Sequence, residues 1–227
     1  MATTIDDPLA ALANHALGLV SDGDVVGLGS GHAATAFVRA LAERVRGGLR
    51  VRGVPTSEET ARLARELGID LVGLESDIAL TIDGADEVDA KLNLIKGYGG
   101  ALVRERIVAA ASDRQVILIT SEKLVEVLGS RGRLPVEVMP FAVPLCRRRL
   151  EDLALKPTLR MHDERPFVTD NFNVILDCAV GPIDEPAELA RAIRRIPGVI
   201  ETGLFLGTAD MVIVADGGAI RELVRRP

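Results

Sequence analysis

The sequence predicts an α/β protein with a doubly wound, mostly parallel sheet domain (Rossmann-like) and a smaller ferredoxin-like α+β domain. Strands and helices alternate through the first half of the chain, as in a parallel sheet with helices on both faces. The second half has the order β-α-β-β-α-β, which is that of the ferredoxin-like unit. The 227 residues are 48% hydrophobic and 26% charged. This composition indicates a globular protein and excludes a disordered or coiled-coil chain.

The first half alternates apolar segments with helical ones. Apolar runs bounded by glycine or polar residues predict strands at Asp24–Leu28, Leu49–Val54, Ile69–Leu74, Ile78–Ile82, Leu92–Ile95 and Gln115–Thr120. Helices are expected at Ala33–Val45, after Pro55 with Thr56 or Ser57 as N-cap, at Gly99–Ala111 and at Ser121–Leu128. In the first helix the apolar residues recur at helical spacing, and acidic residues follow the N-cap of the second.

The pattern changes near Gly129–Leu134. Strands are expected at Val136–Met139, at Thr158–Met161, within Phe167–Val180 and at Val199–Phe205, with helices at Pro144–Leu153 and Pro186–Ile196. A strand at Met211–Val214 and a short helix at Ala219–Val224 are expected to return to the first sheet. The predicted domains are therefore 1–130 with 206–227, and 131–205.

Charge and composition narrow the function classes. The formal net charge is −6 with no basic patch, so we expect no nucleic-acid partner. No apolar run approaches the ~20 residues of a membrane span, and the stretch MATTIDDPLA has no signal-peptide character. The two cysteines, Cys146 and Cys178, form no disulfide framework and have no metal-ligand spacing. We therefore expect a cytoplasmic enzyme or sensor without a metal or cofactor.

Two polar clusters follow predicted strands, where ligands of an open parallel sheet bind. Gly29-Ser30-Gly31-His32 precedes a helix and suits an anion, although a tight turn explains it equally well. Its spacing is not G-x-G-x-x-G, and no acidic residue ends the second strand, which argues against NAD. Asp83-Gly84-Ala85-Asp86-Glu87 offers two carboxylates for acid–base work or for binding sugar hydroxyls. An acidic capping turn is the alternative.

Two further clusters contain lysines. The chain has 27 basic residues, and only four are lysines. Lys91 and Lys156 are explained by chance, which leaves Lys96 and Lys123 as candidates. Lys96 opens the glycine-rich segment Lys96-Gly97-Tyr98-Gly99-Gly100, and Glu105 follows in the next helix. Glu105 is either a general base or a surface residue that complements the helix dipole. Lys123 follows the strand at Gln115–Thr120 and either reaches a ligand charge or lies in solvent. Together the four clusters favour proton transfer on a phosphorylated small molecule.

The sequence resembles the ribose-5-phosphate isomerase family of type A along nearly its whole length. The segments that carry the resemblance are GLGSG, PTSEET, TIDGADEVD, LIKGYGGALVRERI, ITSEKLVEVLG, LPVEVMP, VTDNFNVILD and IPGVIETGLF. The resemblance implies an isomerase that interconverts ribose 5-phosphate and ribulose 5-phosphate without a metal or organic cofactor. It also implies a homodimer or homotetramer, with the smaller domain contributing to subunit contacts.

The resemblance further implies roles for single residues. Glu105 would move a proton between C1 and C2, Asp83 and Asp86 would handle hydroxyl protons and ring opening, and Lys96 would stabilise the enediolate. The substrate-binding positions implied are Ser30, Gly31, His32, Ala33, Gly84, Ala85, Gly97, Tyr98, Gly99 and Lys123.

The chain also departs from the family at positions near the substrate. Where the family usually has a G-T-G-S-T loop, this chain has Gly29-Ser30-Gly31-His32-Ala33. A lysine that is common near the N-terminus of the family corresponds to Leu9. The glycine that usually follows the K-G pair is replaced by Tyr98. A paralogous isomerase for another sugar phosphate is therefore an alternative. A sugar-phosphate-sensing domain is a second alternative, although a sensor would need neither Lys96 nor Glu105.

Overall fold

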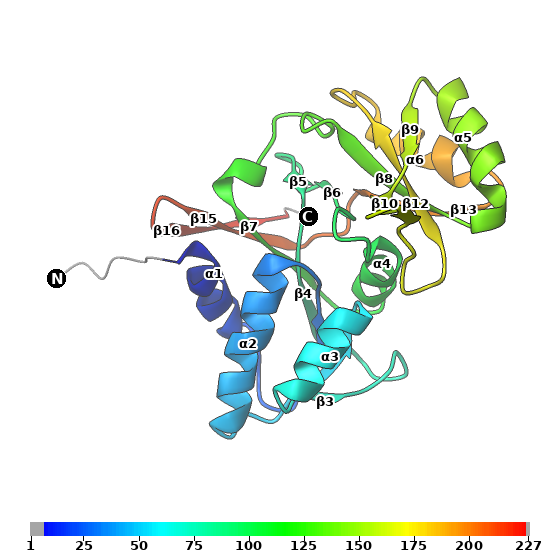
Figure 1. Cartoon of the computed structure of the whole chain (residues 1–227). Coiled ribbons are helices and arrows are strands. Elements are labelled where there is room, and N and C mark those ends of the chain that lie inside the picture. Colours follow the sequence, from blue (N-terminus) through cyan, green and yellow to red (C-terminus); the bar gives the residue numbers. More distant parts are fainter. Residues whose placement is uncertain (1–6, 226–227) are drawn as a thin grey trace. The chain divides into compact units, whose positions relative to one another are not determined.

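The computed structural model describes residues 7–225, and the chain divides into two compact units (Figure 1). The first unit consists of Met1–Ala85, Arg104–Lys123 and Thr208–Pro227, and the second of Asp86–Val103 and Leu124–Gly207. The predicted domain bounds, 1–130 with 206–227 and 131–205, stay a prediction. A domain is a part that can fold alone, and compactness does not test that property.

The first unit is built on a seven-stranded sheet in the order β16-β15-β7-β4-β1-β2-β3. Its strands are β1 (Val25–Leu28), β2 (Arg52–Pro55), β3 (Asp70–Leu71), β4 (Leu80–Gly84), β7 (Gln115–Thr120), β15 (Met211–Asp216) and β16 (Ala219–Val224). All neighbours are parallel except β15 and β16. The chain runs outward from β1 to β3 and then outward from β4 to β15. This reversal makes the sheet doubly wound.

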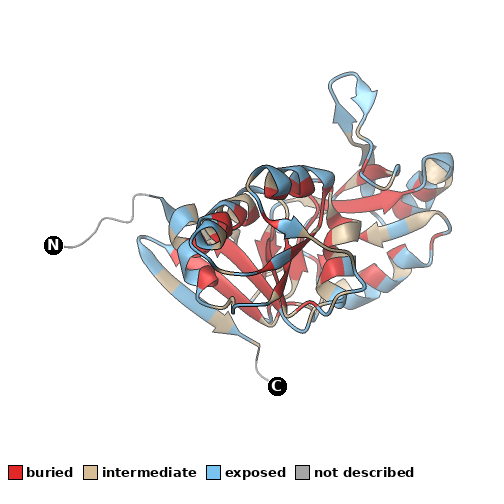
Figure 2. Cartoon of the chain, turned by 90° about the horizontal axis from the view of Figure 1, so that it is seen from below, coloured by how far each residue is buried: buried red, intermediate tan, exposed pale blue. Residues whose placement is uncertain are grey.

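Helices cover both faces of this sheet. The helices of this part of the chain are α1 (Pro8–Leu17), α2 (His32–Arg46), α3 (Glu58–Glu66) and α4 (Leu102–Ala110). On one face, Phe37 of α2 and Ile82 of β4 belong to the main core, whereas Val108 of α4 packs with Val25 and Val54 in a second cluster. Burial on both faces explains why β1 and β7 are apolar at nearly every position. Buried strands of this kind are red in Figure 2.

The second unit contains a four-stranded antiparallel sheet in the order β13-β8-β12-β9. Its strands are β8 (Arg133–Val138), β9 (Lys156–Leu159), β12 (Val174–Ala179) and β13 (Val199–Thr202), with helices α5 (Val143–Asp152) and α6 (Pro186–Arg194). The chain order β8-α5-β9-β12-α6-β13 is ferredoxin-like. The predicted fold class is thus confirmed. Cys146 and Cys178 are buried free thiols in this core.

Smaller elements complete the second unit. A three-stranded sheet joins β14 (Leu204–Phe205), β6 (Leu94–Ile95) and β5 (Glu87–Val88). An exposed hairpin of β10 (Met161–His162) and β11 (Arg165–Pro166) separates β9 from β12. Two 3-10 turns remain, η1 (Ser121–Lys123) in the first unit and η2 (Pro140–Ala142) in the second. Within residues 7–225, no helix has the length and apolar character that crossing a membrane requires.

The predicted helix at Ala219–Val224 is wrong, because this segment is the edge strand β16. It pairs antiparallel with β15, and Asp216 faces Ala219 across a two-residue turn. Gly217 and Gly218 in that turn both have positive φ, at 53° and 91°. This is the geometry that glycine pairs favour in tight hairpins. The strand is pale blue and tan in Figure 2 because its residues at this edge of the sheet are exposed or half-buried.

The predicted helix at Ser121–Leu128 is also wrong beyond its first turn. Only η1 is helical, and Leu124 then forms a parallel bridge with Val88. The N–H of Val125 donates to the Val88 carbonyl at 2.9 Å, so the backbone is extended there.

The helix α1, in contrast, was not predicted from the sequence. Asp7 caps it by accepting the N–H of Leu9 at 2.9 Å, and Pro8 occupies its first position.

Candidate active site

The reversal of the sheet lies between β1 and β4, which are direct neighbours. On either side of this point the chain leaves the sheet in opposite directions, which opens a crevice at the carboxyl ends of the strands. The segment after β1 carries Ser30, and β4 itself ends with Asp83 and Gly84. Two predicted clusters therefore stand at the place where ligands of this fold class bind.

Asp83 joins these two clusters. Its side chain is 0% exposed, and its Oδ1 accepts the N–H groups of Gly84 at 2.7 Å and Ser30 at 3.1 Å. Gly29 makes this approach possible. A Cβ atom at Gly29 would lie 2.5 Å from Cγ and 2.6 Å from Cα of Asp83, so no larger residue fits. The ends of β1 and β4 are thereby tied together through one carboxylate.

Hydroxyl groups from β2 and α3 surround the Ser30 side chain. Ser30 Oγ donates to Ser57 Oγ at 2.9 Å, Ser57 Oγ donates to Thr60 Oγ1 at 3.0 Å, and Thr60 Oγ1 donates to the Gly29 carbonyl at 3.0 Å. Thr56 lies 2.8 Å from Ser30 Oγ and donates to the Leu28 carbonyl at 3.1 Å. Ser57 also caps α3 by accepting the Thr60 N–H at 3.1 Å, so one of the two predicted caps is confirmed.

The helix α2 begins directly after this segment. Gly31 is its N-cap and has no side chain to cap it, so the first backbone N–H groups face outward from the helix end. His32 is the first helical residue and is exposed, and Ala33 is half-buried. Leu9, at the position of the usual lysine, lies in α1 and packs against the core of the first unit.

Lys123 lies at the carboxyl end of β7, in η1. Its ammonium donates to the carbonyl of Ala85 at 2.8 Å. Lys123 is therefore part of the turn that follows Asp83 and Gly84. Glu105 stands in the first turns of α4 and is 6% exposed, so it is not the surface residue that the alternative interpretation required.

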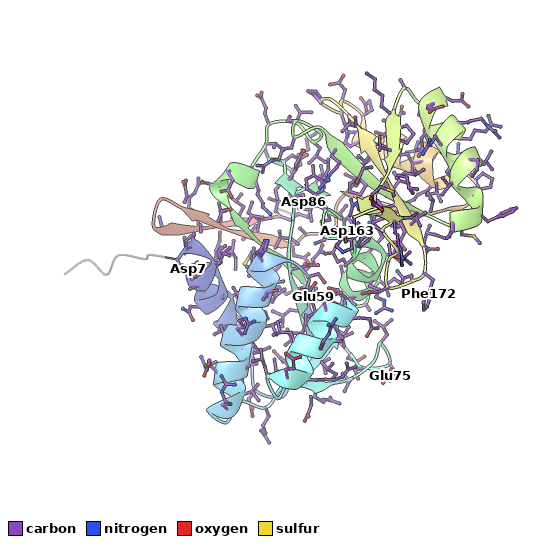
Figure 3. The ribbon with its side chains drawn as sticks, viewed as in Figure 1. Asp7, Glu59, Glu75, Asp86, Asp163 and Phe172 are labelled. Carbon is purple, nitrogen blue, oxygen red and sulfur yellow. The ribbon has the colours of Figure 1, made fainter. Side chains whose placement is uncertain are left out.

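In the second unit, the Lys96-Gly97-Tyr98 segment lies against Asp86, which is labelled in Figure 3. Asp86 Oδ2 accepts the Tyr98 N–H at 3.0 Å, and the Asp86 N–H donates to the Ile95 carbonyl at 2.8 Å. Lys96 is 2% exposed, with its ammonium 5.7 Å from the centre of the Phe205 ring. This unit therefore brings Asp86 and the lysine segment together.

Tyr98 is held by its backbone and by its ring. Its hydroxyl donates to the Arg133 carbonyl at 3.1 Å, and the Arg133 guanidinium lies 3.9 Å from the ring centre. Burial, followed by the negative charges of Glu87 and Asp86, raises the pKa of the Tyr98 phenol. The exposed Gly99 follows it. Tyr98 thus fills space that a glycine would leave open.

Several residues of these surroundings were not predicted as site residues. Thr56, Ser57 and Thr60 appeared in the sequence only as a helix start, although hydroxyls after a strand are themselves a signal. The sequence did not predict a role for Arg160 either, and its guanidinium donates to the carbonyls of Gly97 and Tyr98. Within residues 7–225, no three His, Cys, Asp or Glu side chains are grouped as a metal site would require.

Comparison with known proteins gives consistent matches. The profile of the family described as ribose 5-phosphate isomerase A (phosphoriboisomerase A) matches residues 52–218. Ribose-5-phosphate isomerase A of Gloeobacter violaceus is 57% identical over 214 residues, which are 93% of each chain. The solved ribose 5-phosphate isomerase A of Methanocaldococcus jannaschii is 39% identical, with a TM-score of 0.92 over 96% of this chain and 99% of that one. A D-ribose-5-phosphate isomerase solved in complex with phospho-erythronic acid is 36% identical, with a TM-score of 0.94 over 98% and 100%.

Proposed function

Because this chain belongs to the ribose 5-phosphate isomerase A family, we propose that it interconverts D-ribose 5-phosphate and D-ribulose 5-phosphate. The reaction is an aldose–ketose isomerisation in the non-oxidative pentose phosphate pathway. The match to the Gloeobacter violaceus isomerase extends over 93% of the chain, so it includes all four clusters of candidate residues. No metal or organic cofactor is needed, since the chemistry consists of proton transfers.

The observation that carries the proposal is the burial of three charged side chains. Asp83, Lys96 and Glu105 are 0%, 2% and 6% exposed. Charged side chains are almost never fully buried unless they are paired or serve a function. Glu87 and Glu137 are buried as well, and neither belongs to the residues that the family resemblance assigns to catalysis. Glu87 accepts the N–H groups of Gly129 and Arg131, and Glu137 accepts three side-chain donors from the segment before β12.

In the proposed mechanism Glu105 is the base. It takes the proton from C2 of the open-chain aldose and returns it to C1, while the proton of the C2 hydroxyl moves to the C1 oxygen. The product is the ketose, and the intermediate is a planar cis-enediolate with negative charge on oxygen. Lys96 stabilises that charge from a position shielded from water, where a fixed cation has its largest effect on the transition state.

Asp83 and Asp86 handle the hydroxyl protons and the opening of the sugar ring. Both carboxylates are oriented by backbone N–H groups, those of Ser30 and Gly84 for Asp83 and that of Tyr98 for Asp86. A carboxylate fixed in this way needs no reorganisation before it acts as an acid or a base. The phospho-erythronic acid of the solved relative also carries a planar carboxylate, and such a group resembles an enediolate.

The remaining candidate residues bind the substrate in this proposal. The segment from Ser30 to Ala33 receives the phosphate with the first N–H groups of α2, which favour anions. The turn and loop residues around the sugar are Gly84, Ala85, Gly97, Tyr98, Gly99 and Lys123. His32 and Ala33 replace the usual hydroxyl residues of the family, and for that reason another sugar phosphate is the second candidate substrate.

We further propose that the chain acts as a homodimer or homotetramer in the cytoplasm. The ferredoxin-like unit exposes large apolar side chains, with Phe141 at 94% and Phe172 at 83%. Phe172, labelled in Figure 3, projects from the segment before β12. Contact with a second copy of the chain would remove the apolar surface of these rings from water, which stabilises association.

The deciding experiment is a turnover assay across ribose, arabinose, erythrose and glucose phosphates. Ribose 5-phosphate should give the highest kcat/KM, and EDTA should leave that rate unchanged. A higher kcat/KM with another sugar phosphate would assign the chain to the alternative isomerase. Binding of a sugar phosphate without turnover of any would support the sensor instead.

A further inference from the structure

Arg160 lies between β9 and β10, and its guanidinium is used almost completely inside the second unit. Nε and Nη2 donate to the two carboxylate oxygens of Asp177 at 2.8 and 2.6 Å. Nη1 donates to the carbonyl oxygens of Gly97 and Tyr98, each at 3.0 Å. Four of the five N–H donors of the group are thus engaged, and the side chain is 10% exposed. Little donor capacity remains for a ligand.

The two carbonyls belong to the segment that follows Lys96. The peptide between Gly97 and Tyr98 is held at both ends, since Arg160 binds its oxygen and Asp86 Oδ2 accepts its N–H at 3.0 Å. Gly97 has a φ of +108°, and a glycine leaves its backbone free to rotate unless other contacts prevent it. Rotation of this one peptide would break both hydrogen bonds. The Gly97–Tyr98 peptide therefore links Arg160 to Asp86, and each side chain helps to fix the orientation of the other.

Neighbouring side chains make this arrangement rigid. The Arg160 guanidinium lies 5.7 Å from the centre of the Phe167 ring, and a Cβ atom at Gly100 would lie 2.5 Å from the same ring. Asp177 supplies the countercharge that a buried guanidinium requires. Only arginine fits this position, because a lysine ammonium has neither the planar fork for Asp177 nor the reach to two carbonyls at once.

We propose that Arg160 is a positioning residue of the isomerase, which fixes the Gly97–Tyr98 peptide and, through that peptide, orients the Asp86 carboxylate. The inference rests on the proposed function, in which Asp86 and Lys96 act on the sugar phosphate. Arg160 touches neither the substrate nor the reacting atoms. It determines instead the orientation of Asp86 and Lys96, the two groups that touch the substrate in the proposed function.

The kinetic test uses Arg160→Lys, with Arg165→Lys on the exposed β11 as its matched control. Displacement of a catalytic group by about 1 Å costs roughly a hundredfold in rate, so kcat for ribose 5-phosphate should fall ten- to a hundredfold while KM changes little. Arg165→Lys should behave like the wild type. A lower melting temperature with an unchanged kcat would mean that Arg160 only stabilises the fold, and a rise in KM alone would mean that it binds substrate.

A second readout follows the loop without any substrate. Tyr98 is the single tyrosine and the chain has no tryptophan, so the tyrosine fluorescence reports on this segment alone. Acrylamide should quench that fluorescence more strongly in Arg160→Lys than in the wild type or in Arg165→Lys. Equal quenching together with a wild-type kcat would overturn the proposal.

The two readouts separate this proposal from the proposed function. If the wild-type chain turns over no ribose 5-phosphate, the proposed function fails, while the quenching experiment still decides whether Arg160 holds the loop. If Arg160→Lys does not fold, Asp177→Asn replaces it, because the amide keeps one acceptor for Arg160. Asp177→Asn should lower kcat to a smaller extent and raise quenching. A kcat and a quenching constant equal to those of the wild type would again overturn the proposal.

Discussion

Asp83 Oδ1 accepts the backbone N–H of Ser30 at 3.1 Å, although the two residues lie 53 positions apart in the chain. This contact joins the carboxyl ends of β1 and β4 at the point where the sheet reverses its winding. A residue assigned to catalysis in our proposal is therefore also a structural link between the anion-binding segment and the acidic turn.

Replacing Asp83 should affect stability as well as activity. In Asp83→Ala the N–H groups of Ser30 and Gly84 lose their acceptor inside the protein, which costs about 1–3 kcal/mol for a buried unsatisfied group. Urea denaturation should show this loss, and turnover should disappear. The exposed Asp77→Ala is the control and should change the free energy of unfolding by less than about 0.5 kcal/mol. A stability equal to the wild type would contradict the structural role.

Glu105→Gln should remove the base while preserving the shape of the side chain. General bases contribute about a hundredfold to ten-thousandfold, so kcat should fall by that amount with little change in substrate affinity. Exchange of the C2 proton with deuterated solvent, followed by NMR, isolates this step. Glu126→Gln, at an exposed position, should exchange at the wild-type rate. Rapid exchange in Glu105→Gln would show that another residue is the base.

The loop after β1 should determine which sugar phosphate is preferred. His32 is exposed at the first position of α2, directly beside the proposed phosphate site. We expect His32→Ala to raise KM with little effect on kcat, since the contact is made equally in the ground state and the transition state. If the natural substrate is another sugar phosphate, the double change His32→Ser with Ala33→Thr should shift kcat/KM toward ribose 5-phosphate. An unchanged KM in His32→Ala would refute the contact.

The phenol of Tyr98 should ionise later than an ordinary tyrosine. Burial and the charges of Glu87 and Asp86 raise its pKa in the folded chain, whereas in the unfolded chain it ionises near pH ~10. The resulting contribution to stability is present below that pH and is lost as the pH rises through the folded pKa. Ultraviolet absorbance of the single tyrosine measures the midpoint, and Tyr98→Phe, which has no phenolate band, is the control. A midpoint at or below that of the unfolded chain would contradict the burial of the phenol.

Self-association should depend on the exposed phenylalanines of the ferredoxin-like unit. Light scattering at micromolar concentration should give the mass of a dimer or tetramer for the wild type. The double change Phe141→Asp with Phe172→Asp should lower that mass, because a charged group in an apolar contact costs desolvation energy. Leu74→Asp, at an exposed apolar position of the first unit, should leave the mass unchanged. A monomeric wild type would refute the proposed oligomer.

The fold and the main candidate residues were predictable because their signals are local. Asp83 and Glu105 lie within a few residues of a strand end or a helix start, and glycines mark the turns beside them. The same local reasoning failed at β16, where a helical spacing of apolar residues competed with the Gly217–Gly218 turn. The antiparallel pairing with β15 decided the outcome, and that pairing is a tertiary interaction that local propensity does not contain.

Arg160 was unpredictable for a different reason. Its two carbonyl partners lie 63 and 62 residues away in the chain, and a backbone carbonyl carries no sequence signature. Asp177 is 17 residues away, across the β10–β11 hairpin. The antiparallel register of β9 and β12, which pairs Leu159 with Leu176, brings Arg160 and Asp177 together.

The hydrogen bonds among the hydroxyl groups around Ser30 all run in one direction, from donor to acceptor. The series runs from Ser30 through Ser57 and Thr60 to the carbonyl of Gly29, and a carbonyl can only accept, so every proton in the series points inward. Ser30 Oγ therefore presents lone pairs, and no hydrogen, to whatever binds beside it. An oxygen of a phosphate dianion also has only lone pairs to offer, so in our proposal the phosphate is bound by the first N–H groups of α2 and not by Ser30 Oγ. A sugar hydroxyl, in contrast, can supply the missing hydrogen. In the proposed site, Ser30 Oγ would accept a hydrogen bond from a sugar hydroxyl, beside the N–H groups that receive the phosphate.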